Sequence, residues 1–132
     1  MAVNYLYDTN IFIYHLNDGS QYHGLFDKSF VTKNIISISS ITRIELLSFP
    51  DISAEDERSV SALLNEFNIV PLTRSIEDQC IQLRKIHKIK LPDAIIIATA
   101  IAIKEVIVTA DREFAKFEKS GIGIAYPDQL IS

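Results

Sequence analysis

The sequence LPDAIIIATAIAIK, residues 91–104, limits the possible folds more than any other stretch of the chain. It is apolar on nearly every side. A water-soluble protein accommodates such a segment only as a helix that other elements cover all round, so we expect it to pack at the centre of the molecule. Pro92 suits the first turn of that helix.

Short apolar strand patterns alternate with helical patterns along the rest of the chain. This alternation implies βαβ units, in which a parallel sheet is covered by helices on both faces. We therefore expect a three-layer α/β/α sandwich with a central, mainly parallel sheet, formed by a single domain spanning residues 1–132. The expected strands lie at residues 3–7, 35–39, 69–72, 105–110 and 122–126, and the other helices at 10–16, 22–30, 40–48, 53–67, 75–88 and 112–120.

Polar residues mark the expected ends of several helices. Ser53 and Ser75 stand where a side-chain oxygen caps a helix start, and Gly121 stands where a glycine ends one. Thr42 and Glu45 have the spacing of a capping box, in which the two side chains bond each other's backbone N–H groups.

Composition excludes several classes of protein. Cys80 is the only cysteine, so the chain has no internal disulfide and no thiolate metal cluster. The four glycines form neither GxGxxG nor GxxxxGK[ST], which argues against nucleotide cofactors. No apolar run is long enough to cross a bilayer and no cationic leader is present, so we expect a soluble, cytoplasmic protein without a membrane partner.

Four acidic residues stand beside strongly apolar segments. Asp8 and Asp111 each follow the carboxyl end of an expected strand, where open α/β sheets bind their ligands. Glu45 lies on the helix side that should face the core, and Asp93 lies in the first turn of the apolar helix. Because parallel strands end at one edge of the sheet, we expect these carboxylates to meet there.

Each acid also has a purely structural interpretation. Asp8 or Thr9 could cap the following helix, and Asp93 could interact with the positive end of its helix dipole. Glu45 could complete the capping box, and Asp111 could belong to a turn or cap the helix that follows. These roles leave unexplained why four acids gather without a positive residue, since crowded carboxylates repel one another and take up protons unless something positive joins them.

A divalent metal ion answers that need. Hard cations prefer oxygen ligands, and Mg²⁺ is held by one or two carboxylates plus water and phosphate. His15, His23 and His87 lack the spacing of a zinc site, so an acid cluster indicates Mg²⁺ or Mn²⁺. Such ions activate water for attack on a phosphodiester. The formal charge of −4 includes these four acids, so loaded metal would make the chain compatible with an anionic substrate.

The strings YDTNIFIY, ISSITRIELL, LPDAIIIATA and VIVTADREF carry a resemblance to a known family. In this order and at these intervals they resemble the PIN-domain family, and within it the VapC-type toxins of toxin–antitoxin pairs. The resemblance covers essentially the whole chain. It implies a PIN-like α/β/α fold and a Mg²⁺- or Mn²⁺-dependent endoribonuclease that leaves a 5′-phosphate and a 3′-hydroxyl. It also implies an RNA substrate, a cognate antitoxin as partner, and a homodimer.

The resemblance assigns roles to particular residues. The catalytic, metal-holding acids would be Asp8, Glu45, Asp93 and Asp111. The polar supports around them would be Thr9, Asn10 and Thr109, and the substrate-binding residues Arg112 and Lys116. The chain departs from many relatives at Ala110, where they carry a basic or amide residue.

Two other functions fit parts of the sequence. An aspartate-nucleophile phosphatase also has a strand ending in Asp, but it needs a second Asp two residues on, and this chain has Asn10 there. A non-catalytic PIN-like module would bind RNA or an antitoxin without turnover, although the presence of all four acids argues against it.

Overall fold

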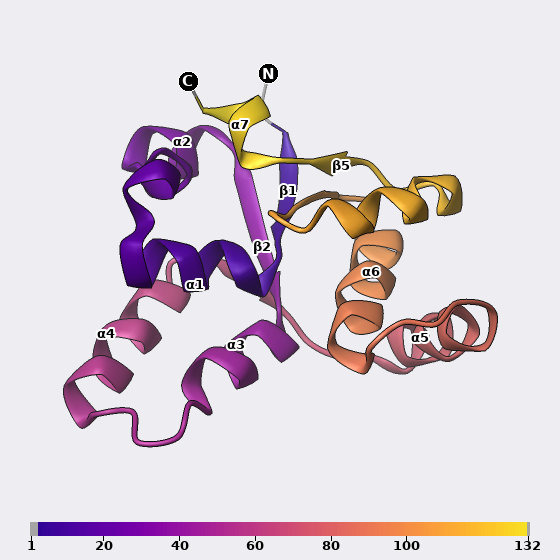
Figure 1. The fold of residues 1–132 in the computed structure, drawn as a ribbon, viewed down its shortest axis with the longest axis horizontal. Helices are drawn as coiled ribbons and strands as arrows, with labels where there is room; N and C mark the ends of the chain where they lie inside the picture. The colour runs from indigo at the N-terminus through magenta and orange to yellow at the C-terminus, as the bar shows by residue number, and fades with distance from the viewer. Residues whose placement is uncertain (1–2, 132) are drawn as a thin grey trace.

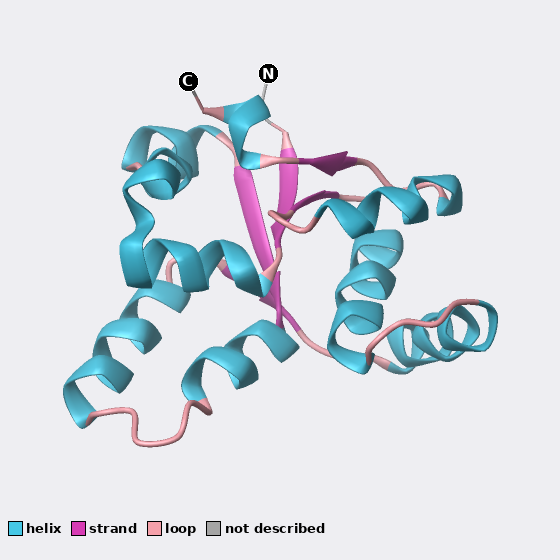
Figure 2. Cartoon of the chain, viewed as in Figure 1, coloured by secondary structure: helices cyan, strands magenta, loops and turns pink. Residues whose placement is uncertain are grey.

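The computed structural model describes residues 3–131, apart from the side chains of residues 18–21, and contains a five-stranded sheet (Figure 1). The strand order is β3-β2-β1-β4-β5, and every neighbouring pair is parallel. The strands are β1 (Asn4–Tyr7), β2 (Ile35–Ser39), β3 (Asn68–Val70), β4 (Val106–Val108) and β5 (Ile124–Ala125). Figure 2 shows the strands running through the middle of the molecule with helices on either side. The expected three-layer sandwich is confirmed.

The helices divide into two groups, one on each face of the sheet (Figure 1). The first group comprises α1 (Thr9–Asp18), the 3₁₀ helix η1 (Gly19–Phe26), α2 (Lys28–Lys33), α3 (Ser40–Leu47) and α4 (Ala54–Leu64). The second comprises α5 (Arg74–Ile86), α6 (Leu91–Ile103) and the 3₁₀ helix η2 (Arg112–Ser120). A short helix, α7 (Pro127–Leu130), follows β5.

Alternating residues of the central strands build a separate core on each face. Leu6 of β1 and Ile107 of β4 pack with α5, α6 and η2. Tyr5 and Tyr7 of β1 point to the opposite face and pack with α1, η1, α3 and α4. Successive side chains of a strand point to opposite faces, so a strand buried on both faces is apolar throughout.

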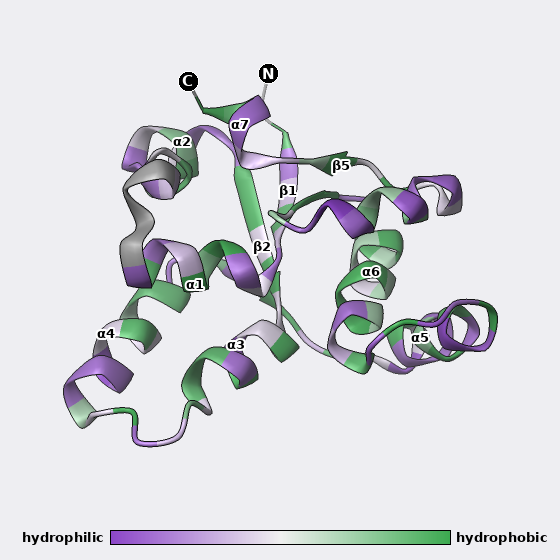
Figure 3. Cartoon of the chain, in the orientation of Figure 1, coloured by the Kyte–Doolittle hydropathy of each residue, from purple (hydrophilic) through white to green (hydrophobic). Residues whose placement is uncertain are grey.

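Helix α6 lies at the centre of the second core, as the sequence predicts. All seven residues from Ala94 to Ala100 are buried. Figure 3 shows that this helix is mostly hydrophobic, whereas η2 beside it is largely hydrophilic. None of the helices in the described part of the chain combines the length and apolarity needed to span a bilayer.

The helix ends agree only partly with the sequence-based expectations. Ser53 caps α4 as expected, and Gly121 ends η2 with a φ of 91°. Helix α5 is capped by Thr73 and not by Ser75, which lies inside the helix. Helix α3 is capped by Ser39. The expected helix at residues 22–30 is wrong, because η1 ends at Phe26 and α2 begins at Lys28.

A buried network of polar side chains crosses the sheet and includes the first residue of β3, Asn68, and the residue before β4, Glu105. The Asn68 amide donates to the Ser37 hydroxyl over 3.0 Å, and that hydroxyl donates to Glu105 Oε1 over 3.0 Å. Ser37 is fully buried and Glu105 is 8% exposed. Burial raises the pKa of Glu105, and its second oxygen has no hydrogen-bond partner among the described residues.

Replacing the Ser37 hydroxyl, which both Asn68 and Glu105 contact, should destabilise the protein. Ser37→Ala leaves Glu105 and Asn68 without their shared partner, and we expect the free energy of unfolding to fall by about 1–3 kcal/mol in urea denaturation. The exposed Ser29 provides a matched control, for which Ser29→Ala should change stability by less than about 0.5 kcal/mol. Equal losses in the two variants would contradict the importance of the buried network.

Candidate active site

The four predicted acids all come from one edge of the sheet. Asp8 directly follows β1, and Asp111 lies three residues beyond the end of β4. Glu45 belongs to α3, which begins immediately after β2, and Asp93 lies in the first turn of α6. Parallel strands with short connections bring these positions together, as expected for the carboxyl ends of such a sheet.

Asp8 is buried, and each of its two carboxylate oxygens accepts one hydrogen bond. Its side chain is 4% exposed. Oδ1 accepts from the backbone N–H of Thr9 at 2.8 Å, and Oδ2 accepts from the Thr109 hydroxyl at 2.8 Å. Burial, the largest cause, together with the charges of Asp93 and Glu45 raises the pKa of Asp8 to about 6, against the two hydrogen bonds, which lower it.

Thr109 connects the segments that follow β1 and β4 through hydrogen bonds of its hydroxyl group. Its hydroxyl donates to Asp8 and accepts from the Asn10 amide at 3.3 Å and from the backbone N–H of Asp111 at 3.0 Å. The hydroxyl therefore uses its one donor and both acceptor positions. Asn10 Oδ1 accepts from the backbone N–H of Ala110 at 3.2 Å. These contacts tie the first turn of α1 to the segment that carries Asp111.

Glu45 is held by Thr9 and not by a capping box. The Thr9 hydroxyl donates to Glu45 Oε1 at 2.8 Å. Because that hydroxyl has one proton, the 2.8 Å contact between Thr9 and Thr42 must be donated by Thr42. The prediction that Thr42 and Glu45 form a capping box is wrong, since Ser39 caps α3. The same spacing instead puts both side chains on one helix face, which is how Thr42 enters the site.

Asp93 is surrounded by several charged side chains that act on its protonation. Burial raises its pKa, and the charges of Asp111 and Glu45 raise it further, whereas Lys90 lowers it. Its position in the third residue of α6 is favourable for an anion because the helix dipole is positive there. The raised pKa means that desolvation and repulsion outweigh this dipole and the nearby lysine.

Asp111 caps η2, accepting from the backbone N–H of Glu113 at 2.9 Å. The structural interpretation of Asp111 is therefore correct, but it accompanies the site role, because the charge of Asp111 also acts on Asp93. Glu113 adds a further negative charge that raises the pKa of Asp93. Glu113 carries no distinctive sequence signal, because acidic residues are common in the first turn of a helix.

A cavity of about 180 Å³ joins acids to lysines. Its polar lining consists of Lys88, Lys90, Asp93, Asp111, Glu113 and Lys116. Lys116, predicted to bind substrate, thus lies near two of the acids. Arg112, also predicted to do so, borders a different cavity, where it pairs with Asp128 at 3.2 Å.

The acids fit a hard divalent cation by their chemistry. Among residues 3–131, no Lys, Arg or His forms an ion pair with Asp8, Glu45, Asp93 or Asp111. Nor does that part of the chain contain three or more Asp, Glu, His or Cys side chains already gathered around one metal position. Mg²⁺ does not require such a cage, because it keeps several waters and uses one or two carboxylates. Asp8 and Asp93 are the residues that could serve.

The raised pKa of Asp8 predicts a pH dependence of stability. The folded chain binds this proton more tightly than the unfolded chain, whose Asp titrates near 3.8. The resulting stabilisation is complete below that pH and is lost as the pH rises through about 6. We expect a loss of about 3 kcal/mol in urea denaturation with chelator present.

Asp8→Asn is the comparison for this titration, because it removes the carboxyl group. Its unfolding free energy should fall less steeply than that of the unaltered protein between pH 4 and pH 7. Identical slopes in the two proteins would show that Asp8 titrates normally.

Removing the Thr109 hydroxyl should affect both stability and protonation. Thr109→Val deprives Asp8 and the Asp111 N–H of a partner, so we expect a loss of about 1–3 kcal/mol in unfolding free energy. The pKa of Asp8, followed by carboxyl carbon NMR, should rise above its value in the unaltered protein. Thr109→Ser keeps the hydroxyl and should preserve that pKa; a rise as large as in Thr109→Val would contradict the assignment.

Known proteins share this architecture. A chain of a toxin–antitoxin complex from Klebsiella pneumoniae is similar, with a TM-score of 0.76, 28% identity, and coverage of 92% of this chain and 96% of that chain. For VapBC2 from Rickettsia felis, bound to a promoter DNA fragment, the TM-score is 0.80 at 22% identity, covering 94% and 98%. For FitAcB from Neisseria gonorrhoeae it is 0.73 at 20% identity, covering 93% and 97%.

Identities below 25% establish a shared fold and no more. No curated protein matches the sequence. The family model of the PIN domain matches residues 5–120, a range that contains Asp8, Glu45, Asp93 and Asp111. The family resemblance seen in the four sequence strings is thereby confirmed, and the chain belongs to the PIN-domain family.

Proposed function

We propose that this chain is a Mg²⁺- or Mn²⁺-dependent endoribonuclease of the VapC type. One observation carries the proposal: Asp8 is buried at the sheet edge, electrostatically coupled to Asp93 and Glu45, without a basic partner among residues 3–131. A protein that keeps such a costly arrangement gains from it when a cation joins the carboxylates.

We assign separate tasks to the acids. Asp8 and Asp93 hold the ion, with Asp111 close to Asp93. A bound divalent ion would lower the pKa of water and offset the charge of the phosphodiester. Glu45 acts as general base: Thr9 orients it by donating to Oε1, which leaves Oε2 free to take the proton of the attacking water.

The reaction is hydrolysis of an RNA phosphodiester. Water adds to phosphorus, the bond from phosphorus to O3′ breaks, and O3′ takes up a proton, giving a 5′-phosphate and a 3′-hydroxyl. Lys88, Lys90 and Lys116 line the cavity beside the acids and supply the positive charge for the RNA backbone. Their position reconciles an acidic chain with an anionic substrate, because the lysines gather where the substrate binds.

We also propose a cognate antitoxin as partner and a homodimer as the assembled form. The similar chain from Klebsiella pneumoniae belongs to a toxin–antitoxin complex, and VapBC2 and VapBC of other bacteria share the fold. These likenesses support the antitoxin proposal. The homodimer rests on the family resemblance alone.

Contacts of Asn10 argue against the aspartate-nucleophile phosphatase. That chemistry needs an acid two residues after the nucleophile. Here the position holds an amide that donates to Thr109 and accepts from the backbone N–H of Ala110, so it joins two segments and cannot act as a general acid or base. A non-catalytic module remains the alternative that an assay must distinguish.

RNA cleavage with metal and chelator tests the proposal directly. Single-stranded RNA should be cut with Mg²⁺ or Mn²⁺ and left intact with EDTA. Glu45→Gln should slow cleavage by about 10²–10⁴-fold, the usual contribution of a general base. The exposed Asp78 on α5 gives a matched control, and Asp78→Asn should cut at the normal rate. Metal binding without cleavage of any RNA would favour the binding module.

Thermal unfolding provides a readout that does not depend on activity. In chelator, Asp93→Asn should raise the melting temperature because it relieves repulsion, even though it gives up a helix-dipole interaction worth about 0.3–1 kcal/mol. Mg²⁺ should then stabilise the unaltered protein more than Asp93→Asn. A lower melting temperature for Asp93→Asn in chelator would mean that the carboxylate serves the helix and not a cation.

A further inference from the structure

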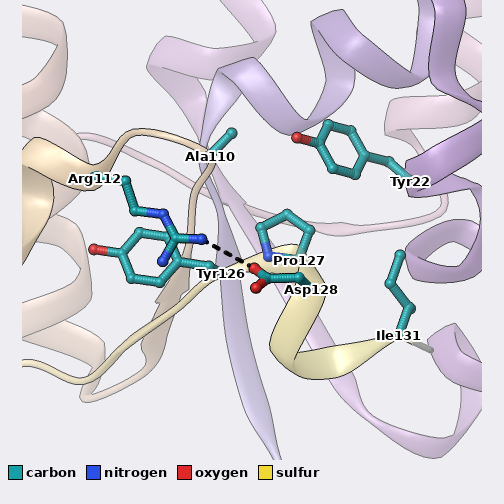
Figure 4. A pocket seen from close by; sticks show the side chains of 7 residues that line it. All are labelled: Tyr22, Ala110, Arg112, Tyr126, Pro127, Asp128 and Ile131. Atoms are coloured by element: carbon teal, nitrogen blue, oxygen red, sulfur yellow. Dashed lines mark hydrogen bonds and ion pairs between the residues drawn. The ribbon is translucent and has the colours of Figure 1, made fainter.

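A second cavity, of about 310 Å³, lies next to the acids and has no part in the proposed hydrolysis (Figure 4). It is formed by η1, by the segment after β4, and by the α7 region at the end of the described chain. Its lining residues are Tyr22, Ala110, Arg112, Tyr126, Pro127, Asp128 and Ile131. The walls are therefore aromatic and aliphatic, with a single pair of charged groups.

One segment of chain separates the two cavities. Ala110 and Arg112 line this cavity, whereas Asp111 and Glu113 line the cavity that contains the lysines. Successive residues of the segment 110–113 thus line the two cavities in turn, and the segment forms the ridge between them. Because this short segment lies between the two cavities, a nucleotide whose phosphate lies at the acids would have its base near the second cavity, to whose lining Ala110 contributes only a methyl group.

Arg112 is fixed in place by two contacts. Its guanidinium carbon lies 3.9 Å from the ring centre of Tyr126, and Nη2 donates to Asp128 Oδ1 at 3.2 Å. Stacking and the ion pair together set the orientation of the guanidinium plane. Both charged side chains stay well exposed, at 66% and 71%, so their remaining N–H groups and carboxylate oxygen are open to a ligand.

Figure 4 shows Tyr22 across the cavity from the Arg112–Asp128 pair, with its hydroxyl directed toward the side where Ala110 lies. An aromatic ring on one side and a paired donor and acceptor on the other suit a flat, polar-edged ligand. Unstacked RNA bases are bound in this way, stacked on aromatic or arginine planes and hydrogen-bonded along their edges.

We propose that this second cavity binds one unstacked base of the RNA and makes cleavage selective for guanine. The inference rests on the proposed ribonuclease function. Guanine presents the O6 acceptor beside the N1–H and N2–H donors, which match the Arg112 N–H groups and the Asp128 carboxylate, respectively. Arginine reads guanine O6 in duplex DNA, and carboxylate side chains accept from the exocyclic amine of a base. Arg112 therefore acts as a specificity residue, and the lysines across the ridge serve the phosphates.

Two measurements test the base site. The first maps the cut positions in a random single-stranded RNA pool by sequencing the products. The second measures, by fluorescence anisotropy in EDTA, the binding of labelled RNA hexamers that carry one guanine, adenine or inosine. Inosine lacks only the N2 amine, so it isolates the contact assigned to Asp128.

We expect guanine at one fixed position beside the cut, and binding of the guanine hexamer about tenfold tighter than that of the adenine or inosine hexamer. In Asp128→Asn the guanine and inosine hexamers should bind equally. Tyr22→Ala should weaken all three by about tenfold, because stacking tolerates every base. Asp78→Asn removes the same charge on α5, outside both cavities, and should keep the guanine preference.

The outcomes separate this inference from the proposed function. Cleavage without any base preference, or with a preference that Asp128→Asn and Tyr22→Ala leave unchanged, overturns the base site and leaves the nuclease standing. Guanine-selective binding without cleavage supports the base site and overturns the nuclease. Absence of base discrimination in both measurements overturns the inference. Variants that lose affinity for an antitoxin-derived peptide while keeping guanine selection would make the cavity a peptide site and overturn it as well.

Discussion

The site depends on a carboxylate that the fold buries and holds by hydrogen bonds without neutralising it. Asp8 receives two hydrogen bonds, from Thr9 and Thr109, which fix both oxygens. Hydrogen bonds orient a charge but do not cancel it, and its pKa stays raised to about 6 because burial and the neighbouring acids outweigh them. Asp8 is thus geometrically prepared and electrostatically unsatisfied, the combination expected where a protein binds a cation.

Most of the fold could be predicted because its patterns are local and repeated. Alternating strand and helix patterns fix the layers, and the apolar segment at 91–104 fixes which helix lies at the centre. The positions of Asp8 and Asp111 at strand ends then place both at one edge of the sheet. The strand order, with β1 in the middle, depends on pairings between distant segments and has no local signal.

The prediction failed where one sequence spacing is compatible with two different local structures. Thr42 and Glu45 are three residues apart, which is the spacing of a capping box and also of neighbours on one helix face. The packing of α1 against α3 decides between them, because Thr9 reaches both side chains. Arg112 illustrates the same limit, since its partners Tyr126 and Asp128 lie in a separate element. The hydrogen bonds of Asn10 could not be predicted from the sequence either, because its partners Thr109 and Ala110 lie about a hundred residues away.

The hydrogen bond between Thr109 and Asp8 joins residues 101 positions apart. Contacts over such separations form late, because the entropy of closing a long loop must be overcome first. During synthesis, a nascent chain has no assembled site until residue 111 has left the ribosome. A chain truncated after Asp93 but before Thr109 carries three of the four acids, yet it lacks both Asp111 and the hydroxyl that bonds Asp8, so the site cannot assemble.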